Sequence, residues 1–140
     1  MARQLGMHIQ RGQLDAVETM FVKDGTDIAE GVAVKQTKAD EVSAVAAAND
    51  KVYGIAGGKR SGVGVAVVRS GKIWAAADDA CVATLSAPAY ITAAGKITHE
   101  AGTNNSLVGY FTSDEVATNG IQNVPSYSNT VRCVQIFVDL

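Results

Sequence analysis

The chain has 140 residues, which suits one domain, and its 12 Lys and Arg nearly balance its 14 Asp and Glu, for a net charge of -2. This balance argues against a general nucleic-acid binder, which would carry a basic patch. No apolar stretch approaches the ~20 residues that a membrane-spanning helix needs. We therefore expect neither a nucleic acid nor a membrane as partner. The N-terminal residues lack the apolar core of a secretory signal.

Residues 1–14 contain Arg3 and Arg11, no acidic residue and no clear hydrophobic period. We expect them to form an extended N-terminal arm, followed by a single β-domain over residues 15–140. Terminal segments of this kind become ordered when a partner holds them. Arg3 and Arg11 are therefore candidate contacts to acidic residues of such a partner.

The remainder of the chain is a series of short β-branched or aromatic segments bounded by Gly, Asp, Asn, Ser or Pro, which is typical of strands. We predict strands at 16–23, 31–36, 51–58, 63–69, 72–76, 89–92, 95–98, 106–112 and 130–140. Turn dipeptides recur between them at Asp24-Gly25, Gly57-Gly58, Ser70-Gly71, Ala94-Gly95 and Asn119-Gly120. This pattern predicts an all-β fold, a small β-barrel or β-sandwich.

Three stretches depart from this pattern. The alanine-rich residues 37–51 allow either a helix or a loop and strand, and residues 76–85 have room for one helical turn. Residues 113–129 form a long polar connection between two predicted strands, and long connections are usually functional or mobile. Since no catalytic residues accompany this connection, we favour a clasp onto a neighbouring molecule over the lid of an enzyme.

The glycine-rich residues 54–68 invite a comparison with phosphate-binding loops. Only three residues separate Gly54 from Gly58, and Arg60 stands where a phosphate-binding loop has its hydroxyl residue. The segment that follows has the pattern of a strand, whereas a phosphate cradle needs the N-terminus of a helix. We interpret residues 59–62 as the connection between two strands.

Few residues suggest chemistry. His8 and His99 have no nearby Cys or carboxylate at a ligand spacing, so we predict no metal site. Cys81 and Cys133 are far apart, and we expect two buried, reduced thiols rather than a disulfide. Trp74, the single tryptophan, suits a core or an interface better than a sugar-binding platform. Paired carboxylates from separate strands remain possible without any positive sign of them.

Two predicted strands, 63–68 and 131–138, are largely apolar on both faces. One monomer core need not cover both faces, and large exposed apolar patches usually mark interfaces. This favours an oligomer, which we expect to be a homotrimer. The candidate contacts to a partner or a second subunit on these and neighbouring segments, together with the arm, are Arg3, Arg11, Gly64, Trp74, Val134 and Ile136.

The order of segments resembles the small capsid decoration, or cement, proteins of tailed bacteriophages over about residues 30–140. The matching stretches are Ser86-Ala87-Pro88-Ala89-Tyr90, Gly95-Lys96-Ile97-Thr98 and Val108-Gly109-Tyr110-Phe111. Position 86 is Ser where this pattern would have Gly, and the 113–129 segment is longer than in the pattern.

The resemblance implies a β-barrel or β-sandwich without enzymatic activity or cofactor. Such proteins bind the outer surface of the expanded shell, often as trimers, and reinforce contacts between capsomers. The implied partner is the major capsid protein, and the implied location is the virion, after synthesis in the host cytoplasm.

Two alternatives remain on the sequence alone. One is a β-barrel module of a virion that binds a host receptor or a glycan, although aromatic residues make up only 6% of the chain. The other is a small β-fold enzyme that uses carboxylates from different strands.

Overall fold

A computed structural model of the chain describes residues 14–59, 64–119 and 131–140, and in this part it holds strands and no helix. The strands are β1 (Leu14–Val22), β2 (Ala33–Lys38), β3 (Glu41–Ala44), β4 (Gly54–Lys59), β5 (Gly64–Ala76), β6 (Pro88–Ile91), β7 (Ile97–Thr98), β8 (Ser106–Asn119) and β9 (Val131–Asp139). The predicted all-β fold is confirmed, and it is a barrel rather than a sandwich.

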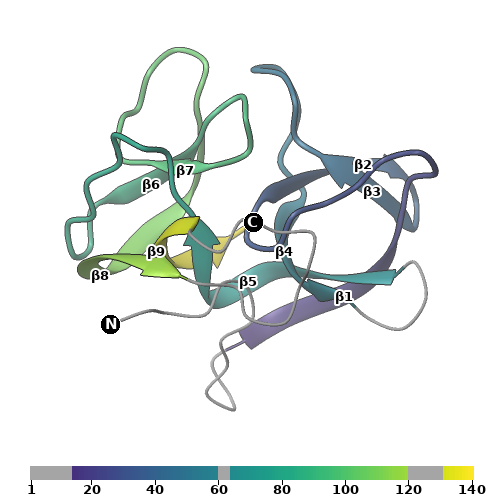
Figure 1. The fold of residues 1–140 in the computed structure, drawn as a ribbon, viewed down its shortest axis with the longest axis horizontal. Coiled ribbons are helices and arrows are strands. Elements are labelled where there is room, and N and C mark those ends of the chain that lie inside the picture. The colour runs from purple at the N-terminus through teal and green to yellow at the C-terminus, as the bar shows by residue number, and fades with distance from the viewer. Residues whose placement is uncertain (1–13, 60–63, 120–130) are drawn as a thin grey trace.

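The first half of the fold is a closed barrel of five strands in the order β1-β3-β2-β4-β5, with β1 also pairing β5 (Figure 1). The β1–β3 pairing is parallel and the others are antiparallel. Its interior is filled by small aliphatic side chains, which suit the narrow space inside a small barrel. The buried side chains of this core are Met20, Ile28, Val34, Val42, Ala56, Val65 and Val67.

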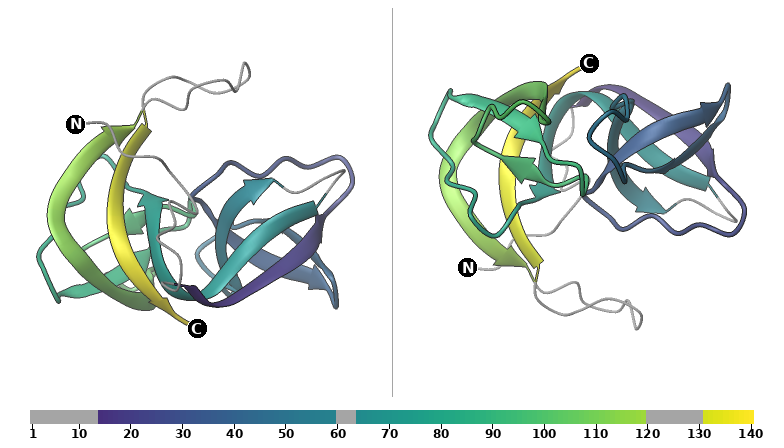
Figure 2. Two further views of the ribbon diagram at one scale, coloured as in Figure 1. Left: turned by 90° about the horizontal axis from the view of Figure 1, so that it is seen from below. Right: turned by 90° about the horizontal axis from the view of Figure 1, so that it is seen from above.

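The second half, which we call the curled sheet, has the order β5-β9-β8-β6-β7. Strands β8 and β9 bend strongly along their length, so the sheet curves back on itself (Figure 2). Ala77, directly after β5, forms a parallel bridge with Ile97 of β7. The backbone amide of Asp78 then donates to the carbonyl of Ile97 at 2.8 Å. The curled sheet thus approaches closure through a single bridge.

Strand β5 belongs to both halves. Its first part pairs β1 from Gly64 to Gly71, and its second part pairs β9 from Ser70 to Ala76. The change of partner falls at Gly71, whose φ of 131° is readily available only to glycine. The predicted turn at Ser70-Gly71 is therefore wrong, because glycine here bends a continuous strand.

Other turn and helix predictions had mixed outcomes. Asp24-Gly25 and Ala94-Gly95 do lie in turns, whereas Gly57-Gly58 lies within β4. Residues 37–51 contain the end of β2 and all of β3, and residues 76–85 contain turns, so neither stretch is helical. The alanines Ala46–Ala48 lie in the loop after β3, where Ala46 and Ala47 are exposed.

The long connection predicted at 113–129 is also partly wrong. Strand β8 continues to Asn119, where it pairs with Val131 of β9, and Val116 pairs with Val134. Residues 113–119 are therefore strand, and their polar character reflects the exposed side of a long hairpin. Residues 120–130, with the rest of the predicted clasp and the turn at Gly120, lie outside the described residues.

The closed barrel and the curled sheet pack against each other through shared strands, which explains why some strands are apolar on both sides. On β5, Val67 packs into the closed barrel while Val68 belongs to the core of the curled sheet. On β2, Val34 and Ala33 divide in the same way. The outer side of the closed barrel is thus part of the core of the curled sheet, and one chain covers both faces.

Candidate interaction surface

Most exposed large apolar side chains gather on the curled sheet. Among the described residues, those on the curled sheet and its loops are Val82, Leu85, Leu107 and Tyr110, with exposed fractions of 55%, 62%, 62% and 43%, and Leu140, directly after β9, is 39% exposed. The closed barrel exposes Val17 and Phe21 on β1. The sequence reasoning named none of these seven residues as a candidate contact.

The outward positions of β6, β8 and β9 form a continuous apolar surface. A register shift in the β6–β8 pairing, between Ala89 and Tyr90, interrupts the alternation of β8. Val108 and Phe111 therefore both enter the core, and Leu107 and Tyr110 both lie on the outside. Tyr110 lies between Pro88 of β6 and Phe137 of β9 in the ladder. We call this surface the apolar face and define it by Pro88, Tyr90, Leu107, Tyr110 and Phe137.

Two features fix the geometry of the apolar face. The rings of Tyr110 and Phe137 stack with centroids 5.4 Å apart and planes inclined by 13°. Gly109 permits this close approach, since a Cβ there would lie 1.8 Å from the carbonyl oxygen of Phe137. The Val-Gly-Tyr-Phe stretch of the sequence therefore combines a core residue, a required glycine and an exposed aromatic residue.

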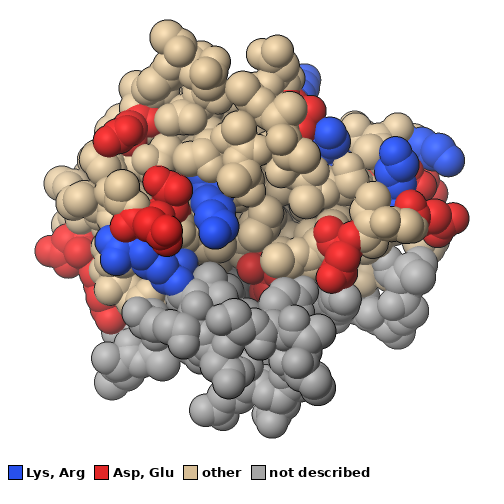
Figure 3. Space-filling model, turned by 45° about the horizontal axis from the view of Figure 1, so that its top comes forward, with Lys and Arg blue, Asp and Glu red and all other residues tan. Residues whose placement is uncertain are grey.

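The parts of the strands that form the apolar face contain no charged residue. Residues 85–91, 106–112 and 133–138 include no Asp, Glu, Lys or Arg. On the side of the molecule shown in Figure 3, charged side chains lie in small groups of both signs with broad uncharged areas between them. Lys72 of β5, opposite Phe137 in the ladder, borders the face on one side.

The segment before β6 brings Leu85 beside the apolar face. The amide of Ser86 donates to the carbonyl of Phe111 at 2.8 Å, and the amide of Phe111 donates to the carbonyl of Ala87 at 2.9 Å. Ser86 has a φ of 69°, the one positive value at a non-glycine position among the described residues. The conformation accounts for the glycine that the family pattern has here.

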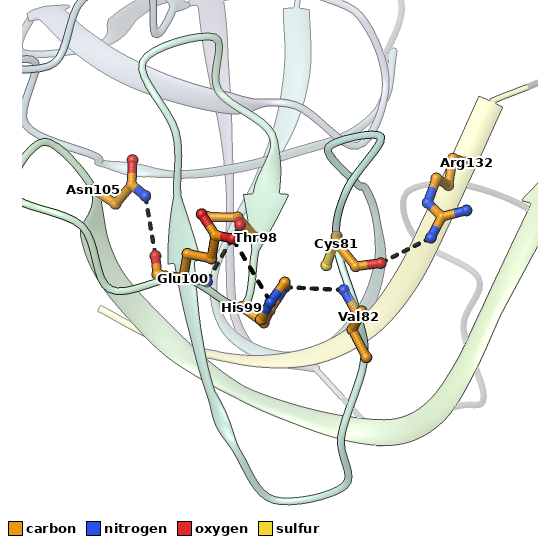
Figure 4. A network of polar contacts seen from close by, with 7 residues as sticks. All are labelled: Cys81, Val82, Thr98, His99, Glu100, Asn105 and Arg132. Atoms are coloured by element: carbon orange, nitrogen blue, oxygen red, sulfur yellow. Dashed lines mark hydrogen bonds and ion pairs between the residues drawn. The ribbon is translucent and has the colours of Figure 1, made fainter.

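The 78–83 loop is held by side chains from two other elements (Figure 4). Arg132 of β9 donates from Nη2 to the carbonyl of Cys81 at 2.8 Å. The amide of Val82 donates to Nδ1 of His99 at 3.0 Å. His99 itself follows β7, and Asn105 donates to the carbonyl of the adjacent Glu100. Val82 is thus presented from a fixed backbone.

Cys81 and Cys133 are both buried and neither forms a disulfide, as predicted. Burial raises the pKa of the Cys81 thiol to about 11, although the charge of Arg132 acts in the opposite direction. A thiol with so high a pKa is almost entirely protonated near neutral pH and is a poor nucleophile.

The closed barrel carries the more polar surface. Tyr53 donates a hydrogen bond to Glu18, and this bond raises the pKa of Tyr53. The guanidinium of Arg69 lies 4.1 Å from the centre of the Tyr53 ring and donates from Nε to the Tyr53 carbonyl. A shallow hollow of about 360 Å³ beside them is lined by Gln36, Lys51, Val52, Tyr53 and Arg69.

The structure places the predicted contact residues differently from the sequence reasoning. Trp74 is 4% exposed, and Val134 and Ile136 are fully buried. Gly64 is buried at the start of β5, opposite Phe21. All four residues are buried within the chain. Their role as contacts stays a prediction, and their burial gives it no support. Arg3 and Arg11 lie outside the described residues.

The reason for missing the exposed residues is physical. Strand alternation alone does not say which of two apolar faces enters the core, and both faces of β8 are apolar around Leu107 and Val108. The signal that could have identified the exposed residues was the absence of charge from Ser106 to Thr112. A strand with only one face in the core usually carries polar residues on its other face.

In the part of the chain that the structure describes, no group of His, Cys, Asp and Glu is arranged to hold a metal ion. No helix there has the length and apolar character to cross a membrane. β4 and β5 are antiparallel neighbours that are consecutive in the chain, which fits a strand connection between them. Lys59, however, belongs to β4, and residues 60–62 of the interpreted connection lie outside the described residues.

An exposed apolar face on an all-β chain is typical of proteins that bind other proteins. The model of the phage structural cement protein family, described by E217 gp24 and Pam3 gp6, matches residues 4–125. The chain belongs to this family, which is structural and not enzymatic. No curated protein sequence matches the chain.

Proposed function

We propose that the chain binds the outer surface of the phage head and stabilises the lattice of the major capsid protein. The family match over residues 4–125 carries this proposal, because it makes the chain a structural component of a phage capsid. The outer surface and the major capsid protein as partner are the further steps proposed here. Synthesis in the host cytoplasm before attachment fits a protein that joins a finished shell.

The fold supports a role in reinforcement. The closed barrel pairs β1 with both β3 and β5, and closure removes the edges that invite unwanted strand pairing. The two halves share one buried cluster through β2, β4 and β5. In the described residues, the closed barrel and the curled sheet are therefore joined by a common packed core, which suits a protein that reinforces contacts between other subunits.

The decisive experiment uses shells of the phage that encodes this chain, prepared without it. Added protein should bind at a fixed ratio to the major capsid protein and raise the temperature at which the shells disassemble. Mass and stoichiometry of the loaded particles measure the first effect, and calorimetry measures the second. Shells that neither bind the protein nor gain stability would contradict the proposal.

The N-terminal arm gives this proposal a second part. We propose that residues 1–14 attach to the shell through Arg3 and Arg11, while the β-domain of residues 15–140 folds alone. Removing residues 1–14 should weaken binding, and the loss should be largest at low salt, where charge pairs are least screened. Equal binding of the full-length and truncated proteins would exclude this role.

The homotrimer also remains a proposal. The argument for a trimer from strands that are apolar on both faces is weaker, since these faces of β5 and β9 are buried within one chain. Sedimentation of the free protein and of protein released from particles measures the state directly. A monomer in both preparations would rule the trimer out.

A further inference from the structure

We propose that the apolar face, with Leu85 beside it, is the surface by which the chain docks on the capsid shell, and that its occupant is an uncharged apolar patch of the major capsid protein. The proposal rests on the proposed function and adds to it a specific face and a specific chemistry. Neither the family match nor the fold alone selects one face of the molecule.

The first reason is the exposure of the side chains. Leu107 and Leu85 are each 62% exposed, and Tyr110 is 43% exposed beside its stacked partner Phe137. Contiguous apolar surface of this kind usually marks a binding site. Aromatic residues are enriched, and charged residues depleted, at the centres of protein interfaces. The apolar face has both properties.

The second reason is the chemistry that the face excludes. Binding of nucleic acid or of anionic lipid requires Lys or Arg to neutralise phosphates. The strands of the apolar face contain none between residues 106 and 112 or between residues 133 and 138. Apart from Lys72 at its border, the face carries no charge that a partner would have to pair, so an uncharged protein surface fits it, and the family makes that partner part of the capsid.

The third reason is preorganisation. Gly109 and the Tyr110–Phe137 stack fix the centre of the face, and the Ser86–Phe111 hydrogen bonds fix its margin. A rigid surface loses little conformational entropy on binding, so more of the interaction energy appears as affinity. The face therefore needs no rearrangement to dock.

The test places a charge on the face without touching the core. Leu107→Lys should weaken binding to shells by about tenfold or more, because an unpaired charge within an interface is costly. Leu85→Lys, at the margin of the face, should weaken binding in the same direction but less. Phe21→Lys is the matched control, since Phe21 is 54% exposed on β1 of the closed barrel. The control should bind like the wild type, and all three variants should keep the wild-type melting temperature within a few degrees.

Salt separates the apolar face from the arm. Binding by the truncated protein that lacks residues 1–14 should change little between low and high salt, because its remaining contact is uncharged. Leu107→Lys in this background should abolish the residual binding. If the residual binding of the truncated protein falls steeply with salt, a charged surface carries it and the proposal is overturned.

The outcomes distinguish this proposal from the function on which it rests. Failure of the wild type to bind shells would remove the proposed function itself. Normal binding by Leu107→Lys and Leu85→Lys, with the wild type bound, would overturn only the choice of face. Sedimentation covers the remaining case: if the Lys variants dissociate a wild-type oligomer and still bind shells, the face joins copies of this chain and the proposal is wrong.

Discussion

The closed barrel and the curled sheet close in different ways. The closed barrel is completed by a long antiparallel ladder from Leu14 to Phe21 of β1 against β5. The curled sheet ends in the two-residue strand β7 and one bridge between Ala77 and Ile97. The sheet with the weaker closure is also the one that displays exposed aromatic and aliphatic residues. We infer that the closed barrel supports the fold while the curled sheet presents its binding surface.

The shared strand β5 joins these two roles. Val67 and Val68 point into different cores, so a change in one half of β5 is felt in the other. The comparison therefore predicts different effects on stability in the two halves. Substitutions in the curled sheet should first disrupt its short closure at β7, and substitutions in β5 should destabilise both halves.

The largest effect is expected for Gly109→Ala in the curled sheet. The new Cβ would lie 1.8 Å from the Phe137 carbonyl oxygen, so β8 and β9 would have to separate locally. We expect a loss of about 3 kcal/mol or more in the free energy of unfolding, measured by chemical denaturation. Hydrogen exchange should show lost protection in β8 and β9 before β1.

Gly25→Ala is the matched control for this substitution. Gly25 has a φ of 75° in the turn after β1, and a Cβ there meets nothing within 4 Å. Only the backbone strain remains, which costs about 1 kcal/mol. Equal losses for the two variants would show that the close approach at Gly109 is relieved by a small movement.

A second large effect is expected for Ile136→Ala. Ile136 is fully buried in the core of the curled sheet, opposite Phe111. Removing its side chain should destabilise the free monomer by about 2–5 kcal/mol. A loss below about half a kcal/mol, the range of ordinary surface positions, would instead support the sequence-based idea of Ile136 as a subunit contact.

Much of the fold was predictable because it depends on local pattern. The alternation in residues 16–23 predicted β1, and the β-branched and aromatic residues of 106–112 and 130–140 predicted the first half of β8 and all of β9. The glycines were harder to interpret, since Gly71 bends a strand and Gly57 lies inside one. A glycine-containing dipeptide shows only that the backbone can turn at that point, and strand pairing in the folded protein determines whether it does.

The candidate surface was less predictable for a related reason. Trp74, Val134 and Ile136 looked like contacts because both faces of their strands are apolar. The sequence does not reveal that a second half of the same chain covers one of those faces. Burial by a distant part of the chain and burial by a second subunit leave the same local pattern.

A smaller effect, of the opposite sign, is expected for Ser86→Gly. Ser86 adopts a φ of 69°, which costs a residue with a Cβ about 1 kcal/mol or more. Glycine removes this strain but gains entropy in the unfolded chain, so the net stabilisation should reach about 1 kcal/mol at most. Thermal melting measures it.

The reverse substitution tests the same argument at Gly95. Its φ is 78°, and a Cβ there would lie 2.8 Å from Val32. Gly95→Ser should therefore destabilise the protein while Ser86→Gly stabilises it. If Ser86→Gly is destabilising, the Ser86 side chain makes a contact that outweighs its backbone strain.

The smallest effect on stability is expected for a loop. Each half of the fold fixes one loop through side-chain hydrogen bonds. In the curled sheet, Arg132 and His99 hold the 78–83 loop, whereas in the closed barrel one carboxylate holds residues 45–50. Asp50 accepts hydrogen bonds from the amides of Ala46 and Ala47 at 2.9 Å and from Lys35 at 3.0 Å. The bond from Ala46, then that from Lys35, lowers the pKa of Asp50 below its ordinary value.

This lowered pKa gives a pH dependence of defined sign. A carboxyl with a lower pKa in the folded state stabilises the protein above its unfolded pKa of about 4, and the contribution is lost as the pH falls through the folded value. Asp50→Asn should therefore melt slightly below the wild type at neutral pH, and the difference should shrink in acid. Asp79→Asn, at an exposed position in the 78–83 loop, controls for the loss of one negative charge. A difference that grows as the pH falls would show that the charge of Asp50 does not hold the 45–50 loop.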